Sequence, residues 1–306
     1  MIYDLIIIGA GPAGISAGIY SARQKLKSLI ISKDVGGQVS KKAVDIENYP
    51  GFDKISGPDL TNIFSKQLEK NELKVALDEV LKVTKPGKNF VLSTKSGQTY
   101  EALAVIIATG ADPRPLEVLG EKEFMGKGVS YCALCDGPVF KDKIVAVIGG
   151  GNSGFETALF LSNYVKKLYI LEFGKEAKAD IENQSLIAKT GKAEIITNAK
   201  VLKIEGQGFV KSLTYQDLTA NKENTLSVDG IFVEIGYSPA TAFVKELVDF
   251  SEKDEIIADL ESYATKTPGL FAAGDCNKGK YKQIVTAVGE GAKAALAAYE
   301  YVQKQK

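Results

Sequence analysis

Two cysteines separated by two residues, Cys132 and Cys135, are the side chains of this sequence best suited to redox chemistry. At this spacing the two sulfurs can meet in a small ring, so the thiols can close into a disulfide and reopen. Asp136 follows directly, and it is the best available proton carrier because the chain has no histidine. Three alternatives stay open: two separate buried thiols, half of a metal site, and an aspartate that only caps a helix or turn. Cys276 has no near partner, and we interpret it as a small packed residue.

Two glycine-rich segments of one pattern point to two dinucleotides. The first is Gly9-Ala10-Gly11-Pro12-Ala13-Gly14, directly after an apolar run, and the second is Gly149-Gly150-Gly151-Asn152-Ser153-Gly154. The glycines permit a tight turn, close backbone approach to a pyrophosphate and close packing of helix on strand. The helix that follows presents its N–H groups to the phosphates. For the first segment, a tight turn without a ligand is the alternative.

The second segment carries a further signal at Glu172, the last residue of an apolar run at 168–172. A carboxylate at this position can accept hydrogen bonds from the adenosine ribose and would repel a 2′-phosphate, which predicts NADH rather than NADPH. A solvated strand end is the alternative. The first segment has Ser32 and Lys33 at the matching place, with Asp34 just beyond, so its adenosine contact is not identified.

These residues must be positioned by two copies of one strand–turn–helix–strand module. We expect strands at 3–8 and 28–32 around a helix at 13–23, and strands at 143–148 and 168–172 around a helix at 155–164. Further strands are predicted at 74–83, 89–93, 99–108, 194–204, 210–216 and 229–235. A polar stretch at 219–225 indicates an exposed loop, and 283–302 has the spacing of a helix.

The order of the modules predicts an α/β fold of two Rossmann-like domains, each with three β/β/α layers. Pro113 and Pro115 stiffen a link at 111–115, and 236–239 marks the return. One domain then consists of 1–112 and 245–306, and a second domain at 113–244 carries the dithiol and is inserted into the first.

Composition excludes several classes of protein. Lys and Arg total 38 and so do Asp and Glu, so no net field favours nucleic acid or a membrane surface. The absence of histidine excludes Ser-His-Asp and Cys-His hydrolases, and three cysteines cannot supply a four-ligand zinc site. No apolar run reaches 18 residues, and the N-terminus does not have the pattern of a signal peptide. The few cysteines favour a reducing, cytoplasmic location.

With these motifs, the chain resembles a known family, the low-molecular-weight thioredoxin reductases, over nearly its whole length. Within that family it is most similar to the reductase portion of the alkyl hydroperoxide reductase flavin subunit. The matching segments are 9–14, Gly36-Gly37-Gln38, Glu47-Asn48-Tyr49-Pro50-Gly51, Ala108-Thr109-Gly110, the dithiol box 132–137, 149–154, Gly274-Asp275 and Tyr281-Lys282-Gln283.

The resemblance implies FAD in the first domain and a nicotinamide nucleotide in the second. Gln38 and Asn48 are then expected near the flavin, Asp275 at the ribityl chain, and the N–H groups of Gln283 and Ile284 at the flavin ring. It also implies that Cys135 lies nearer the flavin, that Cys132 attacks the partner's disulfide, and that Asp136 is the acid–base group. A homodimer and a rotation of the inserted domain are implied in the same way.

Two departures from the family refine the expectation. The segment Glu172-Phe173-Gly174-Lys175 stands where NADPH-using members resemble one another in a His-Arg-Arg patch. The chain also begins at the first strand, without the thioredoxin-like region of the flavin subunit, so we expect a separate thioredoxin- or glutaredoxin-like protein as acceptor. The sequence therefore predicts an FAD-dependent NADH:disulfide reductase. NADPH or ferredoxin as electron donor, an NADH oxidase and a redox sensor stay open as alternatives.

Overall fold

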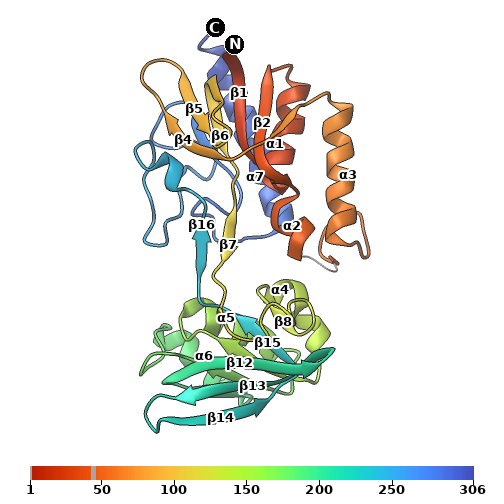
Figure 1. Cartoon of the computed structure of the whole chain (residues 1–306), viewed down its shortest axis with the longest axis vertical. Coiled ribbons are helices and arrows are strands. Elements are labelled where there is room, and N and C mark those ends of the chain that lie inside the picture. Colours follow the sequence, from red (N-terminus) through yellow and green to blue (C-terminus); the bar gives the residue numbers. More distant parts are fainter. Residues whose placement is uncertain (1, 43–45) are drawn as a thin grey trace. The chain divides into compact units, whose positions relative to one another are not determined.

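The structure, a computed structural model, describes residues 2–42 and 46–306 (Figure 1). The chain divides into two compact units: Met1–Asp112 with Ser238–Lys306, and Pro113–Tyr237. The second unit is therefore an insertion in the first. The return comes at Ser238, within the predicted stretch 236–239, but residues 238–244, which we assigned to the inserted domain, belong to the first unit. The physical reason is that Val244 and Val248 are buried in the core of the first unit.

The first unit is built on a mostly parallel sheet in the order β3-β2-β1-β6-β5-β4, with β17 also paired to β6. β1 lies in the middle, parallel to β2 on one side and to β6 on the other. The strands are β1 (Ile2–Ala10), β2 (Ser28–Val35), β3 (Val75–Leu77), β4 (Val80–Thr84), β5 (Phe90–Thr94), β6 (Thr99–Ile107) and β17 (Leu270–Ala272).

Both faces of this sheet are buried, as the continuous apolar run in β1 requires. Leu5 and Ile7 pack on the helical side, and Ile6 and Ile8 pack on the opposite side with Phe90. The helices of the unit are α1 (Pro12–Arg23), α2 (Gly37–Lys42), α3 (Gly57–Lys70), the 3₁₀ helix η2 (Ala242–Val244) and α7 (Ile284–Gln303).

The second unit has a parallel sheet in the order β11-β10-β9-β15-β8 and an antiparallel sheet β12-β13-β14. The parallel strands are β8 (Val129–Ser130), β9 (Ile144–Ile148), β10 (Lys167–Leu171), β11 (Ala193–Ile196) and β15 (Gly230–Val233). The antiparallel strands are β12 (Ala199–Gln207), β13 (Phe209–Asp217) and β14 (Lys222–Ser227). The helices are α4 (Ala133–Asp136), the 3₁₀ helix η1 (Gly137–Phe140), α5 (Asn152–Ser162) and α6 (Ile181–Thr190).

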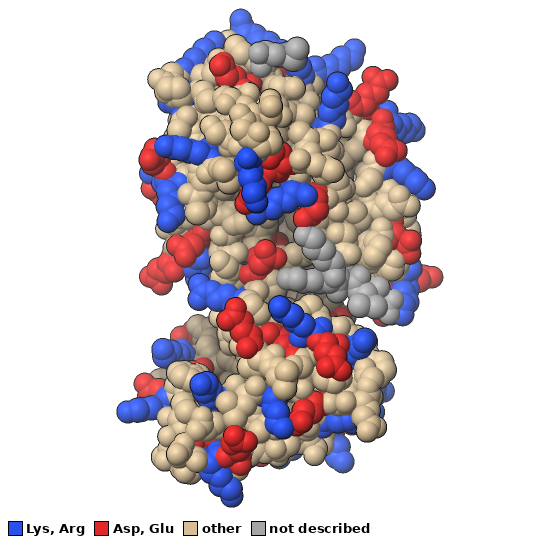
Figure 2. Space-filling view, in the orientation of Figure 1, with Lys and Arg blue, Asp and Glu red and all other residues tan. Residues whose placement is uncertain are grey.

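Three layers result in the second unit. Val145 and Val147 of β9 pack against α5 through Phe155. Ala146 and Ile148 point to the other face and pack against the antiparallel sheet. The chain passes between the units through β7 (Ala111–Pro113) and β16 (Tyr237–Pro239), which form a two-stranded sheet. Lysines, arginines and acidic residues are interspersed on the visible face of each unit, in keeping with the balanced charge (Figure 2).

Several predicted elements differ from those found. The stretch 219–225, expected as a loop, is mostly strand β14, and its polar side chains are those of a partly solvated edge strand. The predicted strand 194–204 is two strands, β11 and β12, separated at Asn198, which has a φ of +53°. The stretch 74–83 likewise contains both β3 and β4. In the described residues, no helix has both the length and the apolar character needed to cross a bilayer.

Candidate functional site

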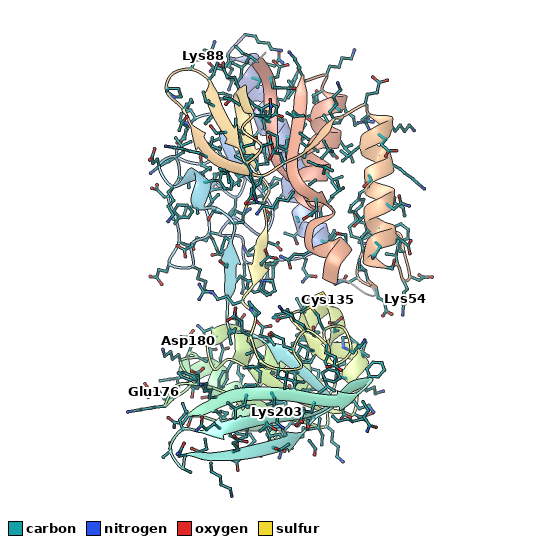
Figure 3. All side chains as sticks on the ribbon, in the orientation of Figure 1. Lys54, Lys88, Cys135, Glu176, Asp180 and Lys203 are labelled. Carbon is teal, nitrogen blue, oxygen red and sulfur yellow. A yellow bond between two sulfur atoms is a disulfide. The ribbon has the colours of Figure 1, made fainter. Side chains whose placement is uncertain are left out.

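The dithiol is closed into a disulfide between Cys132 and Cys135, whose Cα atoms lie 5.3 Å apart. Cys132 is the residue before α4, and its carbonyl accepts the N–H groups of Cys135 and Asp136 at 3.2 and 3.1 Å. This turn folds the chain back far enough for the sulfurs to bond. Cys135, labelled in Figure 3, is exposed, and Cys132 is half-buried. The disulfide is therefore accessible at the surface of the second unit.

Ser130, which sequence reasoning missed, connects the dithiol to Asp136. Its buried hydroxyl donates to the Asp136 Oδ2 at 2.6 Å and accepts the N–H of Cys132 at 3.0 Å. This pair of bonds fixes the Asp136 carboxyl relative to the backbone of Cys132. A serine two residues before the first cysteine was the signal available in the sequence.

In the first glycine turn, one of the three glycines has room for a side chain and the other two do not. A Cβ on Gly9 would lie 2.3 Å from the Ala108 carbonyl oxygen, and one on Gly14 would lie 1.8 Å from the Gly9 oxygen. A Cβ on Gly11 would have no atom within 4 Å. Gly11 precedes α1, which has Pro12 in its first turn and no side-chain cap. The first N–H groups of α1 are thus available for a pyrophosphate.

Two other glycines expected at this site lie close to the turn. A Cβ on Gly274 would lie 2.9 Å from the Cβ of Ala13, and one on Gly37 would lie 3.5 Å from the Cα of Gly11. The side chain of Asn48 donates to Gln283 at 3.2 Å.

The arrangement fits a flavin dinucleotide. The Oγ1 of Thr109 is buried, and no described residue forms a hydrogen bond with it. Helix α7 begins at Ile284 without a side-chain cap, so its first N–H groups are also open to a ligand. Unlike the Thr109 hydroxyl and the first N–H groups of α7, the side-chain amide of Gln38 already has a partner, because it donates to the carbonyl of Ala111.

Asp275 is the acidic group of this site. Burial raises its pKa to about 6, and the nearby Lys282 opposes the shift. Among the described residues, none forms a hydrogen bond with its carboxyl oxygens, which leaves them for hydroxyl donors of a ligand. Lys282 itself pairs with Glu255 at 3.1 Å and donates to the carbonyls of Asp275 and Asn277. Its ammonium therefore holds the loop that carries Asp275.

Two further residues near this loop have structural roles. Glu290 is buried and accepts the N–H of Gly274 and the amide of Asn277, each at 2.7 Å. Burial raises the pKa of the Glu290 carboxyl. The thiol of Cys276 is fully buried, donates to the carbonyls of Ile107 and Ala273, and has its pKa raised to about 12 by burial. Cys276 is therefore a packed, un-ionised thiol, as the sequence indicated.

The second glycine turn repeats the geometry of the first. A Cβ on Gly149 would lie 2.3 Å from the Glu234 carbonyl oxygen, one on Gly154 would lie 1.9 Å from the Gly149 oxygen, and Gly151 faces open space. Helix α5 begins after Gly151 without a side-chain cap. The Asn152 side chain accepts the N–H of Asp180 at 2.8 Å and donates to its carboxylate at 3.0 Å, so it fixes the start of α6. Ser153 is exposed.

Glu172 closes this turn from the end of β10. One carboxyl oxygen accepts the N–H of Gly150 and the other accepts the N–H of Gly174, both at 2.7 Å. The side chain is half-buried. The alternative of a merely solvated strand end is therefore wrong. Each oxygen keeps a second lone pair that can accept a ribose hydroxyl.

Comparison with known proteins gives three consistent findings. Residues 3–291 match the family model described as pyridine nucleotide-disulphide oxidoreductase. The chain is 38% identical over 301 residues to the F subunit of alkyl hydroperoxide reductase from Staphylococcus aureus strain MSSA476, and 39% identical over 309 residues to the Escherichia coli K12 protein of that name. These alignments cover 98% and 99% of this chain but 59% of each relative, so the chain spans well under two thirds of their length.

The solved structures give a match over the whole length. The crystal structure of thioredoxin reductase from Streptococcus pyogenes MGAS5005 superimposes with a TM-score of 0.93 at 37% identity, and the match covers 99% of both chains. The thioredoxin reductase of Giardia duodenalis gives the same TM-score at 32% identity.

Proposed function

Since this chain belongs to the pyridine nucleotide-disulphide oxidoreductase family, we propose that it is an FAD-dependent disulfide reductase that passes electrons from NADH to a thioredoxin-like protein. The observation that carries the proposal is the accessible Cys132–Cys135 disulfide, placed in the same unit as one of two dinucleotide turns. Bound FAD supplies a two-electron relay between the nicotinamide and this disulfide.

The first unit, Met1–Asp112 with Ser238–Lys306, is the proposed FAD domain. The open N–H groups at the start of α1 bind the pyrophosphate, and the Asp275 carboxylate accepts hydrogen bonds from hydroxyls of the ribityl chain. The uncapped N-terminus of α7 offers N–H groups and a partial positive charge that favour an anionic ring edge. Gly110, with a φ of +69° and no neighbour near its Cβ position, keeps the backbone open beside Thr109.

The dithiol carries the transfer to the partner. One electron pair and two protons convert the Cys132–Cys135 disulfide to two thiols. The Cys132 thiolate attacks the partner's disulfide and forms a mixed disulfide with one of its sulfurs. The Cys135 thiolate then attacks the Cys132 sulfur, which re-forms the internal disulfide and releases the partner as a dithiol. Asp136, held by Ser130, is the group that gives and takes the protons.

A small disulfide protein suits the surroundings of this dithiol. Leu134 and Val139, on either side of Cys135 in sequence, are 49% and 76% exposed. Apolar side chains around a reactive group offer contact area to a protein more than to a small polar oxidant. Thioredoxin reductases are among the solved structures similar to this chain, which supports a thioredoxin-like acceptor.

NADH is the proposed donor because the carboxylate of Glu172 occupies the end of β10, where the adenosine ribose of a dinucleotide lies in this fold. A 2′-phosphate placed there would meet a negative charge that two backbone amides hold in position. The cationic side chains that follow, Lys175 and Lys178, are exposed, and so is the carboxylate of Glu176 between them. We therefore propose the second unit, Pro113–Tyr237, as the NADH domain.

The proposal is tested with FAD-loaded protein, NADH and a thioredoxin-like disulfide protein. NADH oxidation should depend on the disulfide protein, and Cys132→Ser and Cys135→Ser should each abolish it. Both variants should retain FAD, because the two sulfurs belong to the second unit. Undiminished disulfide reduction by either variant would contradict the assignment.

A further inference from the structure

Glu234 is a carboxyl group at the centre of the second dinucleotide module that the proposed mechanism does not use. It follows directly after β15, whose last residue Val233 pairs with Ile148 of β9. The sheet order places β10 on one side of β9 and β15 on the other, although all three strands are parallel, so the strand order switches direction between β9 and β15. Ligands of such sheets bind outside the carboxyl ends of the strands at this switch point.

The first unit shows what normally occupies this position. There, Ile8 of β1 pairs with Ile107 of β6, and the next residues are Gly9 and Ala108. A Cβ on Gly9 would lie 2.3 Å from the Ala108 oxygen, and a Cβ on Gly149 would lie 2.3 Å from the Glu234 oxygen. The two modules thus correspond in sequence order and in this contact. Glu234 places a carboxyl group where the first module has a methyl group.

The surroundings favour the neutral form of this carboxyl. Thr157 of α5 donates its hydroxyl to the Glu234 Oε1 at 2.8 Å. The charged group that acts on Glu234 from α5 is Glu156, which repels its negative charge, and Gly149 of the glycine turn lies against the backbone carbonyl of Glu234. Burial, as the largest cause, and Glu156 together raise the Glu234 pKa to about 7, while the Thr157 hydrogen bond acts in the opposite direction and lowers it. In the described part of the chain, no cation pairs with Glu234.

Building on the proposed function, we infer that Glu234 is a positioning residue of the nicotinamide-dinucleotide site and receives the nucleotide in its protonated form. Neutral Glu234 keeps the Thr157 hydroxyl bonded to one oxygen and offers the proton on the other to a nucleotide oxygen. Ionised Glu234 would place a negative charge beside a pyrophosphate. Binding above neutral pH therefore requires uptake of a proton.

The sign of the pH dependence follows from this linkage. Below pH 7 the carboxyl is already protonated in the free protein, so NAD⁺ affinity is at its maximum and independent of pH. Above pH 7 the free carboxyl ionises, and affinity falls by up to about tenfold per pH unit until the pKa of the complex is reached. NAD⁺ is the suitable ligand because the 2′-phosphate of NADP⁺ itself titrates near pH 6. The chain has no histidine, which removes the usual source of background in this range.

The experiment is calorimetric titration of the oxidised, FAD-loaded protein with NAD⁺ at pH 8, in two buffers of different ionisation enthalpy. The wild type should take up between about half a proton and one proton per bound NAD⁺. Glu234→Gln should take up about none, and its affinity should be the same at pH 6 and pH 8. Glu223→Gln, which removes an exposed carboxylate on β14, should behave as the wild type.

The two hypotheses fail in different ways. Absence of NAD⁺ binding by the wild type would overturn the proposed donor site. Binding without proton uptake, or proton uptake that Glu234→Gln retains, would overturn the role of Glu234 alone. Thermal unfolding shows whether Glu234→Gln is folded. We expect it to fold, because the oxygen of the new amide can accept the Thr157 hydrogen bond as the carboxyl oxygen does.

Discussion

The double role of Glu172 gives a prediction that differs from a simple switch of nucleotide preference. Its two oxygens accept the N–H groups of Gly150 and Gly174, both at 2.7 Å. The substitution Glu172→Gln keeps one acceptor oxygen, and the new amide NH₂ group faces the other N–H. A hydrogen bond to a charged group contributes about 1.5–3 kcal/mol, so the turn loses at least this amount. Because NAD⁺ binds the turn in the conformation that Glu172 holds, the lost stabilisation of that conformation should decrease NAD⁺ affinity about ten- to a hundredfold.

The same substitution removes the charge that opposes a 2′-phosphate. We therefore expect Glu172→Gln to bind NAD⁺ and NADP⁺ with similar, weak affinities, and not to become a strong NADP⁺ binder. Equilibrium titration of both nucleotides measures this directly. Glu176→Gln is the matched control, since it removes an exposed carboxylate four residues away. NAD⁺ affinity within about twofold of the wild type in Glu172→Gln would refute the structural role of the carboxylate.

Three further predictions concern the first unit. Gly14→Ala should prevent stable folding of the unit, since its Cβ would meet the Gly9 oxygen at 1.8 Å. Gly11→Ala should fold normally and retain less FAD. Thermal unfolding and flavin absorbance distinguish the two outcomes. Burial raises the Asp275 pKa from 3.8 to about 6, so the free energy of unfolding of the flavin-free protein should decrease as the pH rises from about 4 to 6. Asp275→Asn should weaken this pH dependence in denaturant titrations. The same pH dependence in the variant would contradict the prediction. Glu255→Gln, which breaks the half-buried ion pair with Lys282, should weaken FAD binding severalfold in equilibrium titrations. Asp249→Asn, which breaks the exposed ion pair with Lys266, should leave FAD binding unchanged. Equal effects of the two substitutions would contradict a role of the Lys282–Glu255 pair.

The parts of the fold that depend on glycine spacing were predictable from the sequence. Apolar strands, tight turns and helices at both modules have a strong local signature, because a Cβ at Gly14 or Gly154 cannot be accommodated. The inserted second unit followed from the order of those motifs. The α/β fold and the family are confirmed by the family match and by the similar structures.

Other elements were not predictable because long-range contacts decide them. β14 has a polar sequence, but its backbone pairs with β13, so the pairing and not the composition makes it a strand. Helix α3 was missed although Ser56 caps it by accepting the N–H of Asp59. The assignment of residues 238–244 to the first unit depends on burial of Val244, which local pattern does not reveal.

The site residues divide in the same way. Cys132, Cys135 and Glu172 could be proposed from the sequence because their type and spacing are unusual in themselves. Ser130 was missed although Cys132 and Asp136 lie near it in sequence, because a serine is too common to stand out. Glu234 was missed because its partner Thr157 is close to it only in the fold. Glu234 had a signal in retrospect, as a carboxylate directly after an apolar strand and two residues before a glycine, the place where the first module has Ala108.

The proposed mechanism requires that one chain store electron pairs both on a bound flavin and on the Cys132–Cys135 disulfide. Anaerobic titration with NADH, followed by flavin absorbance and by thiol counting, tests it most directly. The wild type should consume about two NADH per chain and gain two thiols, whereas Cys135→Ser should consume about one and gain none. Consumption of about one NADH by the wild type, with its disulfide intact, would contradict the account.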